Sequence, residues 1–218
     1  MGSLFVNVDF AGRPALLIGA GSVGRRKLGD LLAAGADVLV VEPDPVPETR
    51  QLAAEGRLRL ASAFDETMLD SGPWIFVAVG DGPLAAKLAQ LAKARNLPIN
   101  VADRPELCSF MMPALAADPP FAVAVSTDGT SPALAAAVAA ELRARYRGYG
   151  AVASLLGRLR PLVLASDLPI ERRRVIFKRL AGAPELACLL SEGREAELRA
   201  LIEGLLAPVS LPSNFLLL

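Results

Sequence analysis

The chain has 218 residues, which is enough for a nucleotide-binding domain and a smaller second unit. It carries 23 Lys plus Arg against 23 Asp plus Glu, so no overall charge attracts it to nucleic acid or to an anionic membrane surface. It has no histidine, which excludes Ser-His-Asp and Cys-His triads, HExxH zinc sites and imidazole acid–base catalysis. Proton transfer must therefore use carboxylates, lysines, tyrosines or the ligand itself.

The sequence contains no uninterrupted apolar run of about 18 residues, the length that a membrane-spanning helix needs. The first residues also lack the basic and long apolar segments of a secretory signal. We therefore expect a soluble, cytoplasmic protein. The two cysteines, Cys108 and Cys188, match no metal-knuckle or CxxC spacing, and we expect reduced, structural thiols and no metal site.

Short apolar runs alternate with helical patterns in the first half of the chain, which is typical of a doubly wound α/β sheet. The expected parallel strands are residues 15–18, 38–41, 58–60, 75–79 and 99–102. The expected helices are residues 23–34, 47–55 and 83–95, with glycine after the first two and proline at the start of the third. This order predicts a Rossmann-type doubly wound parallel sheet.

The composition changes after Pro113. Residues 117–120, Ala-Asp-Pro-Pro, are expected to break the structure before one more strand at 121–126. Ser131 then supplies an N-cap, and a proline follows at the first position of a helix from 132 to about 146.

From Tyr149 onward the sequence shows only helical patterns. They are interrupted near residues 167–169, 182–184 and 193. We therefore predict a Rossmann domain at 1–113, a small strand and helix segment at 114–148 and a C-terminal helical domain at 149–218.

A glycine motif, Gly19-Ala20-Gly21-Ser22-Val23-Gly24, directly follows the first expected strand and begins the first expected helix. There Gly19 makes the tight turn, Gly21 lets the backbone approach a pyrophosphate, and Gly24 lets helix and strand pack closely. The helix N-terminus at Ser22 and Val23 offers N–H groups to the phosphates. The alternative is that the glycines only pack a tight corner, but this context favours a dinucleotide site.

Glu42 ends the second expected strand, where an acidic side chain accepts hydrogen bonds from the adenosine ribose hydroxyls. Its charge repels a 2′-phosphate, so we predict NAD rather than NADP as the cofactor. Val79, Gly80 and Asp81 close the fourth expected strand, where a Rossmann sheet borders its cofactor. A simple turn explains these three residues nearly as well.

The fifth expected strand runs into Asn100-Val101-Ala102-Asp103-Arg104-Pro105. Asp103 therefore lies just outside a carboxyl end of the sheet, where ligands of such folds bind, and it is a candidate base. The alternative is that Asp103 organises the turn before Pro105. Position alone does not decide between the two roles.

Three strings in this order resemble the N-terminal family of siroheme synthases: Asn100-Val101-Ala102-Asp103, Ser109-Phe110-Met111-Met112-Pro113 and Val123-Ala124-Val125-Ser126-Thr127-Asp128-Gly129-Thr130-Ser131-Pro132. The resemblance extends over about residues 3 to 145 and includes Phe5-Val6-Asn7-Val8 and Arg25-Arg26-Lys27. Members of this family are precorrin-2 dehydrogenases, and some are also sirohydrochlorin ferrochelatases.

The resemblance implies an enzyme of siroheme biosynthesis that oxidises precorrin-2 to sirohydrochlorin with NAD, and it places the family's aspartate at Asp103. It also implies a homodimer built on the segment after Pro113. Because the substrate bears eight carboxylates, we expect cationic and hydroxyl groups to hold it. The predicted substrate-binding residues are Asn100, Arg104, Ser126 and Thr127. Further candidates are Arg143, Arg145, Arg147 and Arg172 to Arg174, although for each of these a solvated helix face is the simpler explanation.

Two other functions stay open at this point. One is a bifunctional enzyme that also inserts Fe²⁺ into sirohydrochlorin, which the absence of histidine weakens without excluding. The other is a non-catalytic NAD-sensing module, for which the glycine motif serves equally well. The string from Asn100 to Pro113 argues against a sensor, which has no reason to keep it.

Overall fold

The computed structural model describes residues 4–207 of the chain, which divides into two compact units, Met1–Met112 and Pro113–Leu218. Residues 208–218 of the predicted C-terminal domain lie outside the described residues. Among residues 4–207, no helix is both long enough and apolar enough to cross a membrane. The cytoplasmic location expected from the sequence stays a prediction.

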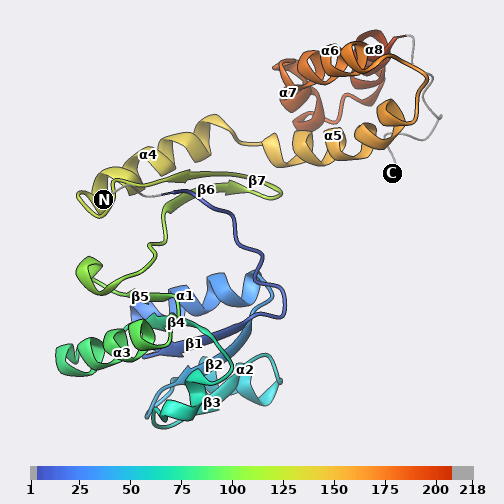
Figure 1. Ribbon diagram of the computed structural model, residues 1–218. Helices are drawn as coiled ribbons and strands as arrows, with labels where there is room; N and C mark the ends of the chain where they lie inside the picture. The colour runs from blue at the N-terminus through green and yellow to red at the C-terminus, as the bar shows by residue number, and fades with distance from the viewer. Residues whose placement is uncertain (1–3, 208–218) are drawn as a thin grey trace. The chain divides into compact units, whose positions relative to one another are not determined.

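The first unit contains a five-stranded parallel sheet in the order β3-β2-β1-β4-β5 (Figure 1). Its strands are β1 (Pro14–Ile18), β2 (Asp37–Val41), β3 (Arg59–Ala61), β4 (Trp74–Val77) and β5 (Ile99–Val101). The predicted Rossmann-type sheet is confirmed, and the strand ends differ from the predicted ends by two residues at most. The strand order reverses between β1 and β4, which is where open α/β sheets bind ligands.

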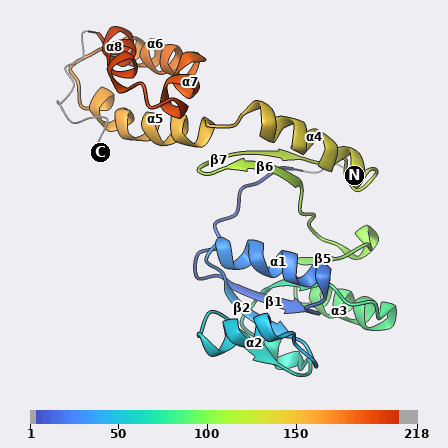
Figure 2. The ribbon, with the colours of Figure 1, turned by 180° about the vertical axis from the view of Figure 1, so that it is seen from behind.

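Helices cover both faces of this sheet (Figures 1 and 2). The helices are α1 (Ser22–Ala33), α2 (Pro47–Ala54) and α3 (Gly82–Ala94), with the short 3-10 helices η1 (Glu66–Leu69) and η2 (Pro105–Leu107). Alternate strand residues point to opposite faces: Leu17 packs with α1 and α2, whereas Leu16 packs with α3 and η1. Strands buried on both faces explain why the sequence shows near-continuous apolar runs.

A segment without helix, residues 108–112, covers part of the α1 face of the sheet, and we call it the cover segment. Its Phe110 ring centroid lies 4.9 Å from that of Trp74 and 5.4 Å from that of Phe76, both on β4. Ser109 fixes the segment to β5, because its Oγ accepts a hydrogen bond of 2.8 Å from Ile99 N. The cover segment therefore returns the chain across the strand that it has just left.

The second unit begins with an antiparallel hairpin, β6 (Ala114–Asp118) and β7 (Phe121–Val125), on which α4 (Pro132–Arg145) packs. The prediction that residues 117–120 break the structure was wrong for Ala117 and Asp118, which belong to β6. Three of the five β6 residues are alanines, which have low strand propensity, so the pattern did not indicate this strand.

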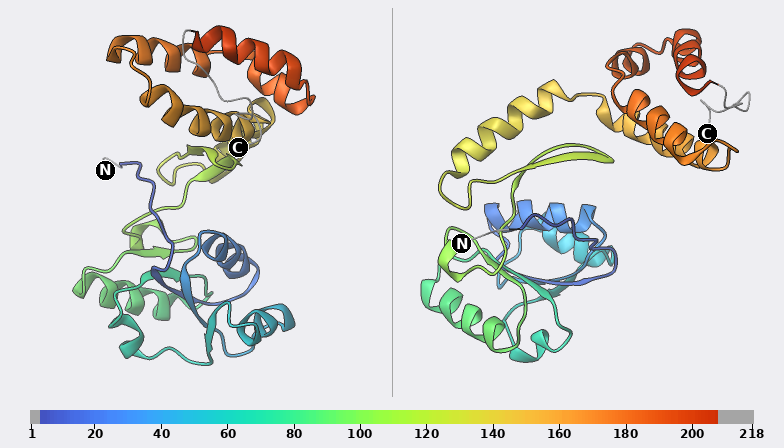
Figure 3. Two further views of the ribbon diagram at one scale, coloured as in Figure 1. Left: turned by 90° about the vertical axis from the view of Figure 1, so that its right-hand side faces the viewer. Right: turned by 45° about the horizontal axis from the view of Figure 1, so that its top comes forward.

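Up to residue 207, four more helices follow in the second unit: α5 (Tyr149–Leu164), α6 (Ile170–Ala181), α7 (Glu185–Ser191) and α8 (Glu195–Leu206) (Figure 3). The breaks expected near 167–169, 182–184 and 193 are the three connections between them. Their apolar faces share one core, in which Leu155, Leu159 and Ile202 are fully buried. Amphipathic faces that pack together in this way explain why the sequence shows a helical period throughout.

Candidate functional site

The carboxyl ends of four neighbouring strands form one aligned edge in the first unit. Glu42, Gly19, Ala78 and Ala102 are the first residues beyond β2, β1, β4 and β5. Backbone hydrogen bonds continue the ladder through them: Gly19 N donates to Val41 O (2.9 Å), Ala78 N to Ile18 O (2.8 Å) and Ala102 N to Val77 O (2.8 Å). With neighbouring strands about 4.8 Å apart, this row is roughly 14 Å long.

The glycine turn in the middle of this row needs two of its glycines for steric reasons. Gly19 has φ +91°, and a Cβ there would lie 2.5 Å from Ala78 O. A Cβ on Gly24 would collide with the carbonyl oxygen of Gly19. The loop after β1 and the start of α1 can therefore pack this closely only with glycine at both positions.

Gly21 differs from the other two glycines. Its φ of −64° is open to any residue, and a Cβ there would meet no atom within 4 Å. Gly21 is also the N-cap of α1. The structure describes the whole first turn of this helix, and that turn has neither a capping side chain nor an acidic residue. The N–H groups at Ser22 and Val23 are thus available to an external anion. The residues present fit a pyrophosphate.

The Glu42 carboxylate reaches across from β2 to the glycine turn. Its Oε2 accepts a hydrogen bond of 2.7 Å from Ala20 N, and its Oε1 accepts one of 3.2 Å from Asp44 N. A carboxylate offers about four acceptor positions, so each oxygen can take a further hydrogen bond. Glu42 therefore holds the loop and keeps acceptor positions, and its contact with the ribose hydroxyls stays a prediction.

The segment after β4 lies beside the glycine turn. β4 ends at Val77, and Val79 packs so closely that its Cγ1 is 2.8 Å from the position of a Cβ on Gly19. Asp81 caps α3 by accepting a hydrogen bond of 3.0 Å from Leu84 N, which gives it a structural role. Cofactor contacts by Val79, Gly80 and Asp81 stay predictions.

Asp103 comes one residue beyond the row, at the β5 end. Its backbone is left-handed, with φ +58°, a conformation that Asp and Asn tolerate better than most residues. Its side chain is exposed, and no donor among residues 4–207 hydrogen-bonds its carboxylate. The turn before Pro105 therefore forms without this carboxylate, which is free to accept a proton.

Two predicted substrate-binding residues flank Asp103. Arg104 is half-exposed and uses only Nε in its contact with Glu106 Oε1, 2.5 Å away, which lowers the pKa of Glu106. Asn100 is instead buried, with 7% of its surface exposed, and its Nδ2 donates to Phe110 O at 3.1 Å. Arg104 can face a ligand, whereas Asn100 acts within the fold.

Sequence reasoning missed Lys27, which lies on α1 and is 8% exposed. Its Nζ donates to Asn100 Oδ1 at 2.7 Å and contacts Met112 Sδ at 3.6 Å. Burial and the nearby Arg26 lower the pKa of the Lys27 ammonium. A signal was present, because Lys27 falls in the buried stripe of α1 with Gly24, Leu28 and Leu31.

The second unit holds Ser126 and Thr127, in the loop between β7 and α4. Ser126 Oγ accepts a hydrogen bond of 3.1 Å from Asp128 N, and Thr127 Oγ1 accepts one of 3.0 Å from Ser131 N. Ser131 caps α4 through Leu134 N, as expected. Substrate contacts by Ser126 and Thr127 stay predictions.

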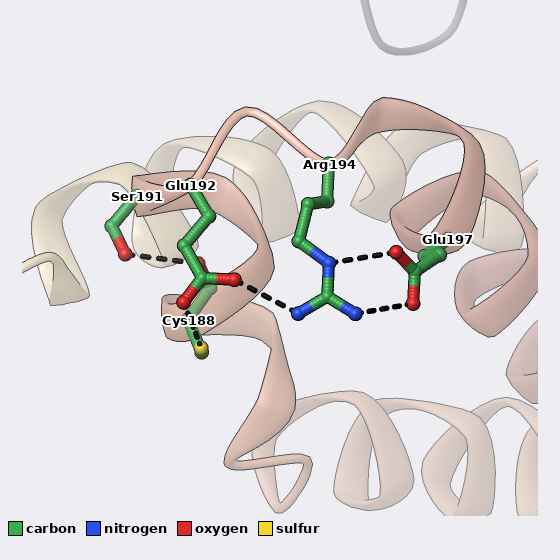
Figure 4. A network of polar contacts seen from close by, with 5 residues as sticks. All are labelled: Cys188, Ser191, Glu192, Arg194 and Glu197. Carbon is green, nitrogen blue, oxygen red and sulfur yellow. Dashed lines mark hydrogen bonds and ion pairs between the residues drawn. The ribbon is translucent and has the colours of Figure 1, made fainter.

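Neither cysteine has the features of a reactive thiol, and both are free of disulfides. Burial raises the pKa of the Cys108 thiol. The hydrogen bond from Cys188 Sγ to Glu192 Oε1, 3.2 Å long, raises the pKa of Cys188 (Figure 4). Both pKa values disfavour the nucleophilic thiolate, which agrees with structural roles.

A cavity of about 230 Å³ lies at the opposite, amino edge of the sheet, beside Pro14, Arg59 and Pro73. Arg59 is ion-paired there with Asp37 at 2.9 Å. The cavity shares no residue with the row at the carboxyl edge, so it is not part of the candidate site.

A sheet of this order, with a glycine turn, an open helix N-terminus and an acidic residue after β2, defines a Rossmann protein that binds a dinucleotide. A family model described as "Putative NAD(P)-binding" matches residues 6–114. The chain belongs to this NAD(P)-binding family.

Relatives extend the similarity beyond this domain. The chain is 34% identical over 180 residues to siroheme synthase of Methylobacillus flagellatus, covering 82% of this chain and 38% of the relative. It is 37% identical over 210 residues to siroheme synthase 3 of Aeromonas hydrophila subsp. hydrophila, covering 95% and 44%. The predicted resemblance to siroheme synthases is confirmed, and the chain spans less than half the length of these two relatives.

Among solved structures, the fold is similar to that of "SirC, precorrin-2 dehydrogenase". The TM-score is 0.70 at 24% sequence identity, covering 93% of this chain and 100% of that chain. This similarity confirms the fold, including the helical part after the Rossmann domain.

Proposed function

We propose that this chain oxidises precorrin-2 to sirohydrochlorin with NAD⁺. The observation that carries the proposal is the row at the carboxyl edge, which has Glu42 at one end, the glycine turn in the middle and Asp103 one residue beyond the other end. The names of the siroheme synthases and of the SirC dehydrogenase support this substrate.

The reaction removes one hydride and one proton from the macrocycle as its conjugation extends. Bound NAD⁺ would supply the hydride acceptor. The N–H groups at Ser22 and Val23 would hold the pyrophosphate, and Glu42 would hold the adenosine ribose. Because Glu42 and Asp103 are at opposite ends of the row, Asp103 would lie near the reactive end of an extended dinucleotide.

Asp103 would take the proton. Its carboxylate is exposed and accepts no hydrogen bond within the described part of the chain, so a proton donor on the substrate meets no competitor. After the hydride has left, the same exposure lets Asp103 return the proton to water.

Substrate carboxylates need cationic and N–H donors. Arg104 keeps its two terminal nitrogens available next to Asp103, since only Nε contacts Glu106. Arg143 and Arg173 are less suited, because they donate to backbone oxygens: Arg143 to Leu115 O at 2.6 Å, and Arg173 to Leu168 O at 2.7 Å. Ser126 and Thr127 stay in the proposal as hydroxyl donors.

The chain would act as a homodimer through the hairpin and α4. On the hairpin, Leu115 and Ala117 of β6 pair with Ala124 and Ala122 of β7, and all four apolar side chains are exposed. Residues 132–140 of α4 are all apolar, and Leu134 is 56% exposed. A two-stranded sheet with open edges and an uncovered apolar face is marginal alone, and a second copy would cover it.

The activity is tested by mixing the protein with NAD⁺ and precorrin-2 and following NADH absorbance together with the spectrum of sirohydrochlorin. Growth of both signals at the same rate is the expected result. Tight NAD⁺ binding without turnover would leave a sensor as the better description. Light scattering tests whether the protein is a dimer. Ala124→Lys is expected to give monomers. If Ala124→Lys stays dimeric, the hairpin face is not the dimer interface.

A further inference from the structure

We propose that Lys27 is a positioning residue for Asp103. The proposal rests on the base role assigned to Asp103 above. The supporting observation is that the buried Lys27 ammonium contacts both ends of the chain segment that contains Asp103. Its Nζ lies 2.7 Å from Asn100 Oδ1, before Asp103 in the chain, and 3.6 Å from Met112 Sδ, after it.

The Lys27 charge is placed where an apolar side chain would be expected. A buried ammonium is normally paired with a carboxylate. Here its acceptors are a neutral amide oxygen and a thioether, with the Phe76 ring centroid 6.0 Å from Nζ. Cys108, Asp30 and, least of the three, Asp103 favour the charged form and so offset part of the lowering of the Lys27 pKa. Packing alone does not require a charge on the buried face of α1, because Leu28 and Leu31 occupy the same face with apolar side chains.

Asn100 transmits the contact with Lys27 to the cover segment. With Lys27 on its Oδ1, the amide is oriented so that Nδ2 donates to Phe110 O at 3.1 Å and contacts Cys108 Sγ at 3.7 Å. Cys108 Sγ in turn accepts a hydrogen bond of 3.1 Å from Val101 N. Loss of the ammonium would free the amide to rotate and would loosen the cover segment from β5.

Asp103 lies between the two anchored ends. The chain leaves β5 after Val101, passes through the left-handed Asp103 and returns at Cys108. Because the Asp103 side chain makes no hydrogen bond of its own within residues 4–207, the place of its carboxylate follows from the backbone that these two ends hold. Lys27 therefore helps to fix the backbone at Asp103 without contacting the carboxylate.

A double-mutant cycle separates this role from a purely structural one. Lys27→Met strands the Asn100 oxygen, and Asn100→Leu strands the ammonium, so each single variant should lose stability. Lys27→Met/Asn100→Leu removes both partners and should recover part of that stability, because Phe110 O still lacks the donor that Asn100 Nδ2 supplied. Lys93→Met makes the first substitution at an exposed position of α3 and should change nothing.

We expect kcat to stay about 10- to 100-fold below wild type in Lys27→Met and in the double variant, because small misplacements of a reacting group cost this much. NAD⁺ affinity should stay within about twofold, since the glycine turn is untouched. Hydrogen exchange of the backbone amides from Asp103 to Met112, measured by NMR, should be faster in both variants and unchanged in Lys93→Met.

A double variant with wild-type kcat and wild-type exchange would overturn the inference, because packing alone would then position Asp103. If wild type itself forms no NADH from precorrin-2, the proposed function fails instead. The exchange measurement still decides in that case, since unchanged exchange from Asp103 to Met112 in the stable double variant overturns the positioning role.

Discussion

The two units use their polar side chains differently. At the carboxyl edge of the first unit, Glu42 keeps acceptor positions and Asp103 makes no hydrogen bond within the described residues. In the second unit, Arg173 and Asp118 are instead held by the backbone: Arg173 donates to Leu168 O and Ser166 O, and Asp118 accepts from Gly148 N and Gly150 N.

The reason for this difference is the architecture. A five-stranded parallel sheet satisfies its own backbone through the ladder and can leave side chains at its edge for a ligand. A two-stranded hairpin joined to separate helices leaves chain ends beside it, and Arg173 and Asp118 bind backbone groups at such ends. An exposed polar group at the sheet edge is therefore better evidence of function than one in the second unit.

The largest expected effect comes from removing the proton acceptor. Asp103→Asn should lower kcat by about 10²- to 10⁴-fold, the usual loss for a positioned base. Asn is preferred to Ala because it tolerates the left-handed backbone at φ +58°. Stopped-flow absorbance at saturating NAD⁺ and precorrin-2 measures the effect.

Asp70→Asn, an exposed carboxylate at the end of η1, is the matched control and should keep wild-type kcat. If Asp103→Asn stays within a few-fold of wild type, the Asp103 carboxylate is not the proton acceptor, and the contrast between the two units loses its main support.

The next effect concerns the open glycine. Gly21→Asp should weaken NAD⁺ binding by about 100-fold or more, because a carboxylate beside the pyrophosphate costs several kcal/mol. The fold should persist, since a Cβ at Gly21 meets nothing within 4 Å. Calorimetry measures the affinity, and circular dichroism checks the fold.

Gly29→Asp is the control for this change, since it lies on α1 and its Cβ also meets no atom. It should bind NAD⁺ normally. Gly24→Ala, unlike both of these variants, should lose stability, because its Cβ would collide with the Gly19 carbonyl. If Gly21→Asp binds NAD⁺ with unaltered affinity, the pyrophosphate does not bind at this loop.

Much of the first unit could be predicted from the sequence because its signals are local. Apolar runs indicated the strands, and the glycine motif indicated the turn between β1 and α1. The contacts of Lys27 could not be predicted, because its partners Asn100 and Met112 are distant along the chain and meet it only in the folded sheet. The left-handed backbone of Asp103 is likewise set by its surroundings.

A smaller effect is expected at the junction between the hairpin and α5. Asp118 Oδ2 accepts hydrogen bonds of 2.9 Å from Gly148 N and 3.0 Å from Gly150 N at the start of α5. Asp118→Ala should lower the free energy of unfolding by about 2 kcal/mol, as for other charge-assisted hydrogen bonds. Asp118→Asn keeps an acceptor oxygen and should lose less, and Asp167→Ala, at an exposed position, should lose nothing. Urea denaturation of the whole chain measures all three, and equal stability of Asp118→Ala and wild type would show that the cap is dispensable.

The smallest effect tests whether Glu42 selects the cofactor. Glu42→Gln removes the charge but keeps an oxygen that can accept from Ala20 N, so the loop should hold its shape. Without the charge that repels a 2′-phosphate, the ratio of NAD to NADP affinity should fall about tenfold, or about 1.4 kcal/mol. Glu42→Ser removes both the charge and the reach to Ala20 N, so it should shift the ratio as much and also weaken NAD binding.

Glu48→Gln, an exposed position on α2, should leave the ratio unchanged. Calorimetry with both cofactors gives the ratios, and if Glu42→Gln keeps the wild-type value, Glu42 serves the loop alone and cofactor choice must come from another residue.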